Sequence, residues 1–357
     1  MSAGCGPEAE AVTRGLGFDC HAVAPVVSVR FPWELASWTM PLLEALVVGG
    51  AVFALVHAVR RYRDGDPVNL ALWWASLVYL FVTEPPLYFP EWFGLDRLYG
   101  FIFAHNLFTV QFMGDRLPLY IIAFYPMISQ LAYELVRSLG VFRQRGPAAG
   151  SVAVAFACQV FYEVFDHLGP QLKWWAWNPG NHIVNHPALA AVPMTSMLLF
   201  ASVSMGAMTY LVVRLAGGPR RGWPLVGRTL VAGVLTPPTM AIAGLPSSLF
   251  DGNPTAQAWI LGAELAVLWL AGAWILARAK PLAEPLSAFA RCYPAIYLGG
   301  MAVCWIGALP AYLAADDGVT TDGTPIGSGP YALACFAGSG LLLAALYRSR
   351  RPAPAAV

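Results

Sequence analysis

Charged residues are scarce in this sequence, and their scarcity excludes most soluble folds. Asp, Glu, Lys and Arg together make up 11% of the 357 residues, whereas hydrophobic residues make up 58%. Soluble domains carry roughly 25% charged residues, so this chain has too little polar surface to fold in water. The formal net charge is only +1, and no run of basic residues is dense enough to bind nucleic acid. We therefore predict an all-α, polytopic integral membrane bundle with no nucleic-acid partner.

Metal-ligand patterns and a signal peptide are missing as well. None of the six cysteines shows the spacing of metal ligands. His182 and His186 are suitably spaced, but the proline and glycine residues around them disfavour the helix that such a pair needs. We predict no metal and no other cofactor. Cys5 and Cys20 lie in an N-terminal tail that we expect to be poorly ordered, and they could form a disulfide or remain free thiols. The first residues lack the charged and apolar segments of a cleavable signal peptide.

Apolar stretches are abundant, and nine of them are long enough for a transmembrane helix. The predicted spans cover residues 37–59, 68–83, 117–136, 151–168, 189–214, 229–250, 257–277, 292–313 and 331–347. A weaker apolar segment runs from Tyr99 to Met113. We divide the chain into an external tail (1–36), a membrane core that carries the site (37–214), C-terminal membrane helices (215–348) and a cytoplasmic tail (349–357).

The arginines predict the orientation of these spans. If Tyr99 to Met113 does not cross the membrane, most of the 21 basic residues fall in loops on one side, which the positive-inside rule makes the cytoplasm. The N-terminus then lies outside a cell membrane and the C-terminus inside. A tenth crossing would place the arginines after Val136 and around Arg214 outside. We therefore predict that Tyr99 to Met113 is re-entrant or lies along the outer interface, beside a cavity.

Ionisable side chains interrupt one of the predicted spans. In a helix over residues 153–168, helical spacing places Gln159, Tyr162, Glu163 and Asp166 on one face. Gly169-Pro170 ends this helix, and an aromatic segment follows. The topology brings other polar residues to the same outer half, where buried polar groups need partners. The predicted catalytic residues are Asp166, Glu163, Glu84 and Asp115, and the predicted substrate-binding residues are Tyr162, Trp174, Trp175, Trp177, Asn178, His105 and Asn106.

Several of these features also have purely structural interpretations. Glu134 lies three residues before Arg137, so we predict an ion pair at the cytoplasmic end of its span. Glu44 and Glu264 stand alone in their spans and are predicted to hydrogen-bond between helices. Tryptophans collect at membrane interfaces in any case. Asp166 could merely cap its turn or pair with Lys173.

The order of features from Glu84 to about Tyr210 resembles an integral-membrane carotenoid biosynthesis family, the one that includes bisanhydrobacterioruberin hydratase. The matching features are Glu84, the aromatic segment Phe101 to Phe112, the proline-led LPLYIIAFYPMISQLAYEL, Asp166, Trp175-Ala176-Trp177 and VPMTSMLLF. The family's Asp-Pro is Asp166-His167 here, and the spans after Arg228 have no counterpart. The resemblance covers about a third of the chain and implies a related helical fold and an isoprenoid or carotenoid-like lipid substrate.

A site of this composition is able to protonate a double bond. Such a reaction needs an acid, a place for the resulting cation and a group that quenches it. Apolar surroundings favour the neutral, proton-donating form of a carboxyl group such as Glu163 or Asp166, and aromatic faces attract cations. Hydration and cyclisation both remain open. We also consider a proton-coupled transporter of a lipid or small molecule, because buried carboxyl groups and prolines in spans occur there too, and a non-catalytic scaffold subunit.

Overall fold

The computed structural model describes residues 5–280, 282 and 284–348, and within them the chain is mostly helical. Nine helical stretches in this part of the chain are long and apolar enough to cross a membrane. They are α2 (Thr39–Arg63), α3 (Val68–Tyr88), α5 (Leu119–Ser138), α6 (Val141–Asp166), the π-helical η3 (Ser196–Val203) continued by α7 (Ser204–Ala216), α8 (Trp223–Val234) continued by α9 (Thr236–Ser248), α10 (Pro254–Ala277), α11 (Ala288–Leu313) and α12 (Gly329–Arg348). Each coincides with one predicted span, so a mostly helical chain with nine helices that could cross a membrane is confirmed over the described residues. The predicted tail over 349–357 lies outside the described residues.

Two helix starts differ most from the prediction. Helix α6 is kinked: Gly146 takes a non-helical conformation with a φ of 77° before Pro147, so a short helix from Val141 is followed by a second one that corresponds to the span predicted from Ser151. The predicted span from Leu189 begins only at Ser196, because the preceding residues form the short strands β6 (Ala188–Leu189) and β7 (Val192–Pro193).

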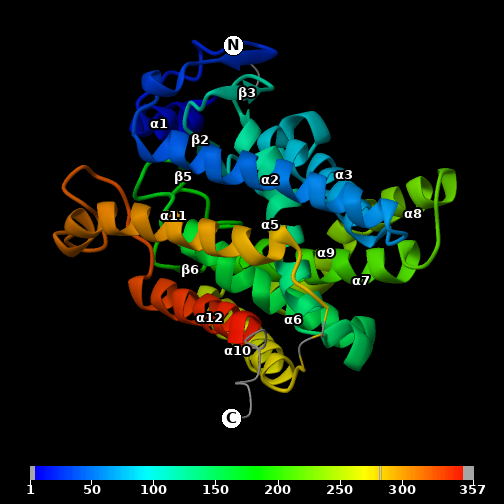
Figure 1. The fold of residues 1–357 in the computed structure, drawn as a ribbon. Coiled ribbons are helices and arrows are strands. Elements are labelled where there is room, and N and C mark those ends of the chain that lie inside the picture. The colour runs from blue at the N-terminus through cyan, green and yellow to red at the C-terminus, as the bar shows by residue number, and fades with distance from the viewer. Residues whose placement is uncertain (1–4, 281, 283, 349–357) are drawn as a thin grey trace.

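Helices α5 and α6 form the centre of the bundle. In the most apolar stretch of each helix, 89% of α5 and 78% of α6 is buried, against 22% of α10 and of α11. Helix α6 packs against α5, α7, α10 and α12, and Figure 1 shows it running through the interior. The peripheral helices leave large apolar side chains exposed, such as Trp259 and Leu333, which is typical of a surface that faces lipid.

A cap covers one end of the bundle. We use this name for α1 (Pro7–Leu16), β1 (Val27–Val29), β2 (Phe103–His105), β3 (Val110–Phe112), β4 (Leu117–Pro118), β5 (Trp175–Trp177) and their connections. Strand β3 pairs with β1 and β4, and β2 pairs with β5. The cap lies at the top left of Figure 1. The segment from Tyr99 to Met113 is therefore extended and adds no tenth helix.

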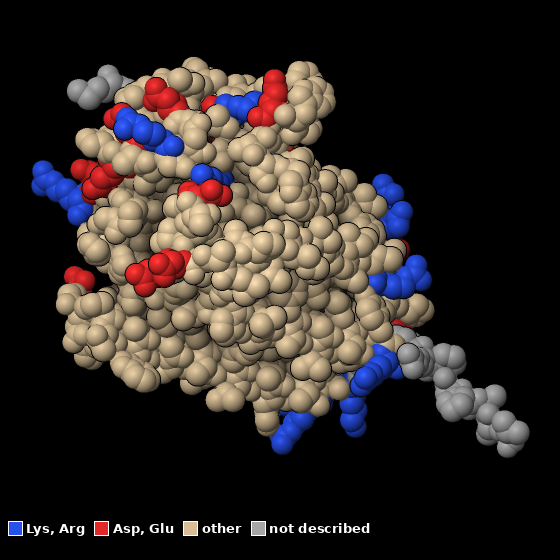
Figure 2. All heavy atoms as spheres, turned by 90° about the vertical axis from the view of Figure 1, so that its left-hand side faces the viewer, with Lys and Arg blue, Asp and Glu red and all other residues tan. Residues whose placement is uncertain are grey.

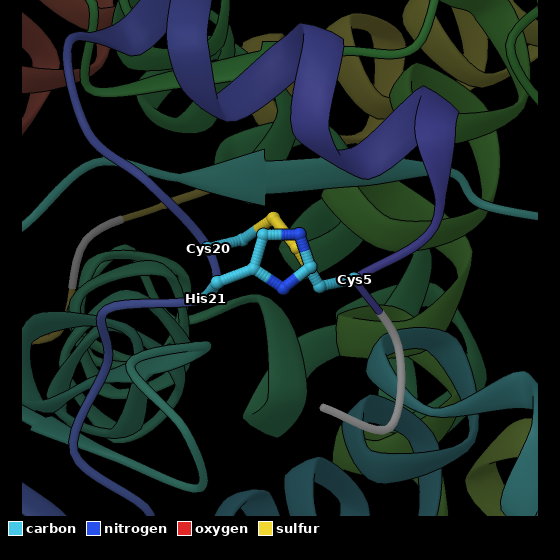
Figure 3. A group of neighbouring side chains, drawn as sticks. All are labelled: Cys5, Cys20 and His21. Carbon is cyan, nitrogen blue, oxygen red and sulfur yellow. A yellow bond between two sulfur atoms is a disulfide. The ribbon is translucent and has the colours of Figure 1, made fainter. Parts of the chain in front are cut away.

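The expectation of a poorly ordered N-terminal tail is wrong for its described part. Helix α1 buries Val12 and Leu16, strand β1 pairs with β3, and a disulfide joins Cys5 to Cys20. Figure 3 shows the disulfide with the imidazole ring of His21 beside it. The three side chains are close enough to share a metal ion, but sulfur atoms in a disulfide are not the thiolates that bind metals.

Arginines concentrate at one end of the bundle. They occupy the last turn of α2, α5, α7 and α12, and α2 and α5 begin at the cap, where Thr39 contacts Trp174 and β4 leads directly into α5. We call the other end of the bundle the arginine end. In Figure 2 a wide uncharged surface covers most of the visible face, with acidic and basic residues together at its upper left and mostly basic residues along its right and lower edges.

Candidate functional site

A partly enclosed cavity of about 90 Å³ lies where the cap meets α3, α5, α6 and η3, and we call it the deep cavity. Its walls are mostly aliphatic and aromatic, and the carboxyl groups of Glu84 and Asp166 both face it. Of the eleven residues predicted as site residues, six line it: Glu84, His105, Tyr162, Asp166, Trp175 and Trp177. Apolar walls with a few converging polar groups are the usual lining of a ligand site, although this cavity is smaller than the roughly 300 to 1,000 Å³ of pockets that hold a drug-sized ligand.

Asp166 is the last residue of α6 and is only 2% exposed. Its Oδ2 accepts a hydrogen bond of 3.3 Å from the hydroxyl of Ser196, the first residue of η3. A π-helical turn has a wider bore than an α-helical one and is frequent at functional sites. No ion pair joins Asp166 to Lys173 among the described residues, so the alternative in which Asp166 pairs with Lys173 has no support.

Glu84 approaches the deep cavity from α3, immediately before Pro85 and Pro86. Its carboxyl group accepts a short hydrogen bond from the hydroxyl of Tyr125 on α5. The side chain is 6% exposed. Two helices distant in sequence thus present one carboxyl group each to the same space.

Aromatic rings form a continuous wall around these carboxyl groups. Antiparallel pairing of β2 with β5 places Phe103 opposite Trp177 and His105 opposite Trp175. The ring of Tyr162 lies edge-on to Phe124, with centroids 5.0 Å apart. Ring faces of this kind attract cations, so the wall suits a positively charged intermediate.

His105 is held by two tyrosines. Its Nε2 lies 3.0 Å from the hydroxyl of Tyr88, and its Nδ1 lies 3.0 Å from the hydroxyl of Tyr120. Burial lowers the pKa of the His105 imidazole to about 3, so the ring is neutral at physiological pH. In a neutral imidazole one nitrogen donates and the other accepts, so one tyrosine hydroxyl donates to the ring and the other accepts from it.

Glu163 does not line the deep cavity, although the sequence places it on the same face of α6 as Asp166. Its carboxyl group lies 3.3 Å from Nε2 of His167. The side chains of this part of α6 form two neighbouring rows. Tyr162 and Asp166, four residues apart, face the cavity, and Glu163 and His167, also four residues apart, lie on a neighbouring face. One residue step turns a helix by about 100°, which is enough to separate the rows.

The other four predicted site residues hold the cap together. Nε1 of Trp174 donates to the hydroxyl of Thr39 at 3.0 Å, and Asp115 pairs with Arg30 at 2.6 Å. The side-chain nitrogen of Asn106 donates to the carbonyl of Lys173 at 2.8 Å, and that of Asn178 donates to the carbonyl of Phe101 at 2.9 Å. None of the four lines the deep cavity.

The sequence analysis did not single out Tyr125, Ser196 or Tyr88. Tyr125 lies beside Pro126 within a span, and a hydroxyl next to a helix-breaking proline is a weak signal at best. Ser196 and Tyr88 carry no local signal, because their partners Asp166 and His105 come from distant segments.

Two of the remaining carboxyl groups in the spans, those of Glu134 and Glu44, have structural partners. The predicted ion pair of Glu134 with Arg137 is confirmed at 2.8 Å, and His57 lies 3.2 Å from the same carboxyl group. The prediction for Glu44 is wrong in its partner: the carboxyl group accepts hydrogen bonds from Thr109 in the cap, at 2.7 Å from the hydroxyl. Oε2 of Glu264 accepts no hydrogen bond from the described residues.

No family model matches the chain, and neither a curated protein nor a solved structure is detectably similar to it. Over the residues that the structure describes, the fold and the site define a mostly helical chain with nine candidate membrane spans and two carboxyl groups lining one aromatic cavity near the cap.

Proposed function

We propose that this protein is a multi-pass membrane enzyme that protonates a double bond in an isoprenoid or carotenoid-like lipid. The observation that carries the proposal is the pair of carboxyl groups, Glu84 and Asp166, facing one aromatic cavity among helices that suit a membrane. The cap lies outside the cell membrane and the arginine end in the cytoplasm, in accordance with the positive-inside rule.

Asp166 is the proton donor in this mechanism. The π electrons of the substrate double bond take its proton, a C–H bond forms, and a tertiary carbocation and the Asp166 carboxylate result. The faces of Tyr162, Trp175 and Trp177 stabilise the cation. A water molecule or a second double bond of the substrate then donates electrons to the cation, and the proton lost in that step returns to Asp166. Glu84, held by Tyr125, keeps a second carboxyl group beside the reacting carbon.

The size of the deep cavity limits what enters it. A dry cavity of about 150 Å³ accepts benzene, so 90 Å³ admits one branched end of a lipid and no more. The rest of the substrate has to lie outside. Leu87 and Phe200 line the cavity from α3 and η3 and are themselves partly exposed, so the chain of the lipid leaves between these helices.

A proton-coupled transporter fits these observations less well. The substrate site of a transporter lies near the middle of the bilayer, whereas the deep cavity lies where the cap meets the helices. A scaffold subunit would not need two carboxyl groups in one cavity, since such groups are costly to bury in a membrane.

The direct test is a lipid profile. Isoprenoid lipids and pigments are extracted from a deletion strain, from the same strain carrying the parental chain, and from one carrying Asp166→Asn. The proposal requires a product that appears only with the parental chain and a precursor that accumulates in the other two. Identical profiles in all three strains would refute it.

A further inference from the structure

A second and larger cavity lies within the cap. Its volume is about 500 Å³, and its walls come from α1, the segment after the Cys5–Cys20 disulfide, the end of α3 and strand β2. We call it the cap cavity. Its lining is mostly apolar, like that of the deep cavity, but Thr13, Tyr88, Asp115 and Arg116 also contribute to it. A cavity of this size with several polar side chains has room for water molecules and offers them hydrogen-bonding partners.

One wall separates the two cavities. Phe103 and His105, from strand β2, line both of them. The phenylalanine ring is apolar, so the imidazole of His105 is the polar part of the wall. Tyr88, which is hydrogen-bonded to this imidazole, faces the cap cavity, and Glu84, one turn earlier on α3, faces the deep cavity.

We propose that the cap cavity is the water compartment of the site and that water passes to the deep cavity beside the Tyr88–His105 pair. This inference rests on the proposed function and names its second reactant: the lipid enters from the membrane side and water from the cap. The oxygen of water forms a C–O bond with the tertiary carbocation, and the resulting oxonium gives one proton to the Asp166 carboxylate. The donor is restored, and the product is a tertiary alcohol.

The neutral state of His105 suits this role. Because one ring nitrogen donates and the other accepts, the imidazole offers a hydrogen-bonding partner to water without adding a charge that would repel the carbocation. His105 is therefore a positioning residue: it orients water at the wall and does not act as the acid.

Thiol labelling tests the compartment without any enzyme assay. Ala104 lines only the cap cavity and Ile121 lines only the deep cavity. In purified protein, a charged methanethiosulfonate should modify Ala104→Cys readily and Ile121→Cys slowly. Adding His105→Ala should speed modification of Ile121→Cys about tenfold, which corresponds to about 1.4 kcal/mol in the barrier to entry. His182→Ala, an exposed residue outside both cavities, is the matched control and should leave the rate unchanged.

Two results would refute the proposed water compartment. The first is that the reagent does not modify Ala104→Cys in folded protein. The second is that adding His105→Ala does not change the rate at which Ile121→Cys is modified. The parental protein, without introduced cysteines, gives the background rate of modification from its own free cysteines, three of which are buried.

Isotope labelling separates this inference from the proposed function. With water carrying ¹⁸O, the product of the parental enzyme should contain the label, and His105→Phe, which keeps a ring in the wall but removes its nitrogens, should form several-fold less labelled alcohol. A parental product without the label would refute the water compartment and leave double-bond protonation standing. A parental chain that transforms no isoprenoid would refute the proposed function, and with it the role of water in the reaction.

Discussion

Replacing Asp166 by asparagine separates chemistry from structure at the deep cavity. Asparagine has nearly the same shape as aspartate and keeps an oxygen that accepts the Ser196 hydrogen bond, but it has no proton to give. If Asp166 is the donor, the substitution removes the acid and leaves the cavity intact. If Asp166 is only structural, activity and folding should be lost together.

The structure sets the expected magnitudes. The bond from Ser196 is 3.3 Å long, longer than the usual range of roughly 2.5 to 3.0 Å for O–H···O bonds, so weakening it costs at most about 1 kcal/mol of unfolding free energy. A positioned general acid contributes roughly 10²- to 10⁴-fold to a rate. We expect the product-forming rate to fall by at least about 100-fold while stability stays within about 1 kcal/mol. Asp166→Glu, which keeps a transferable proton, should retain part of the rate.

The assay measures turnover of an isoprenoid precursor by purified protein in detergent, with thermal unfolding as the check on folding. Glu163→Gln is the comparison variant, because Glu163 lies one turn away on α6, is equally buried, and does not line the deep cavity. It should disturb the contact with His167 and lower stability more than turnover. Well-folded Asp166→Asn protein that turns over at the parental rate would refute the assignment and leave Glu84 as the donor to be tested.

Three further predictions follow from separate parts of the molecule. Tyr125→Phe removes the donor to Glu84 and should lower turnover with little change in the thermal unfolding temperature; an unchanged rate would mean that this hydrogen bond does not support catalysis. Cys5→Ser should destabilise the cap by about 3 kcal/mol, the value expected for a closed loop of some 15 residues, and should speed proteolysis of residues 5–36; an unchanged digestion rate would contradict this. A reporter fused after Arg351 should be cytoplasmic and one inserted near Asp317 external, and an external signal between Ser138 and Val141 would reverse the proposed orientation.

The spans were predictable because they depend on local sequence. A helix in a membrane satisfies its own backbone hydrogen bonds, so hydropathy over about twenty residues is sufficient to find it. The same reasoning failed where backbone pairing or a kink intervened, as at Leu189 and Gly146. Strands β2 and β3 were not predicted, because each is only three residues long and has no independent periodicity.

Residue spacing was sufficient to find the stretch that carries the site but not to separate its members. Tyr162, Glu163 and Asp166 were all predicted on one face of α6, and spacing alone does not show which neighbouring helix each side chain meets. The predicted site residues on other segments also separated into those that line the deep cavity and those that do not. His105 reached the deep cavity, whereas Asn106, its neighbour in sequence, became a hydrogen-bonding residue of the cap.

By itself the sequence determined the helical class, the nine candidate spans and a group of polar residues between Gln159 and Pro187, because hydropathy and helical periodicity are properties of neighbouring residues. Only the tertiary structure decided that Glu84 and Asp166 line the same cavity, that Tyr125 donates a hydrogen bond to Glu84, and that His105 lies in the wall between two cavities. These relations join α3, α5, α6 and the cap, and each depends on how segments far apart in the chain pack together. The physical reason is that a buried carboxyl group takes its partner from whichever helix packs opposite it, and the sequence of a single helix does not show which helix that is.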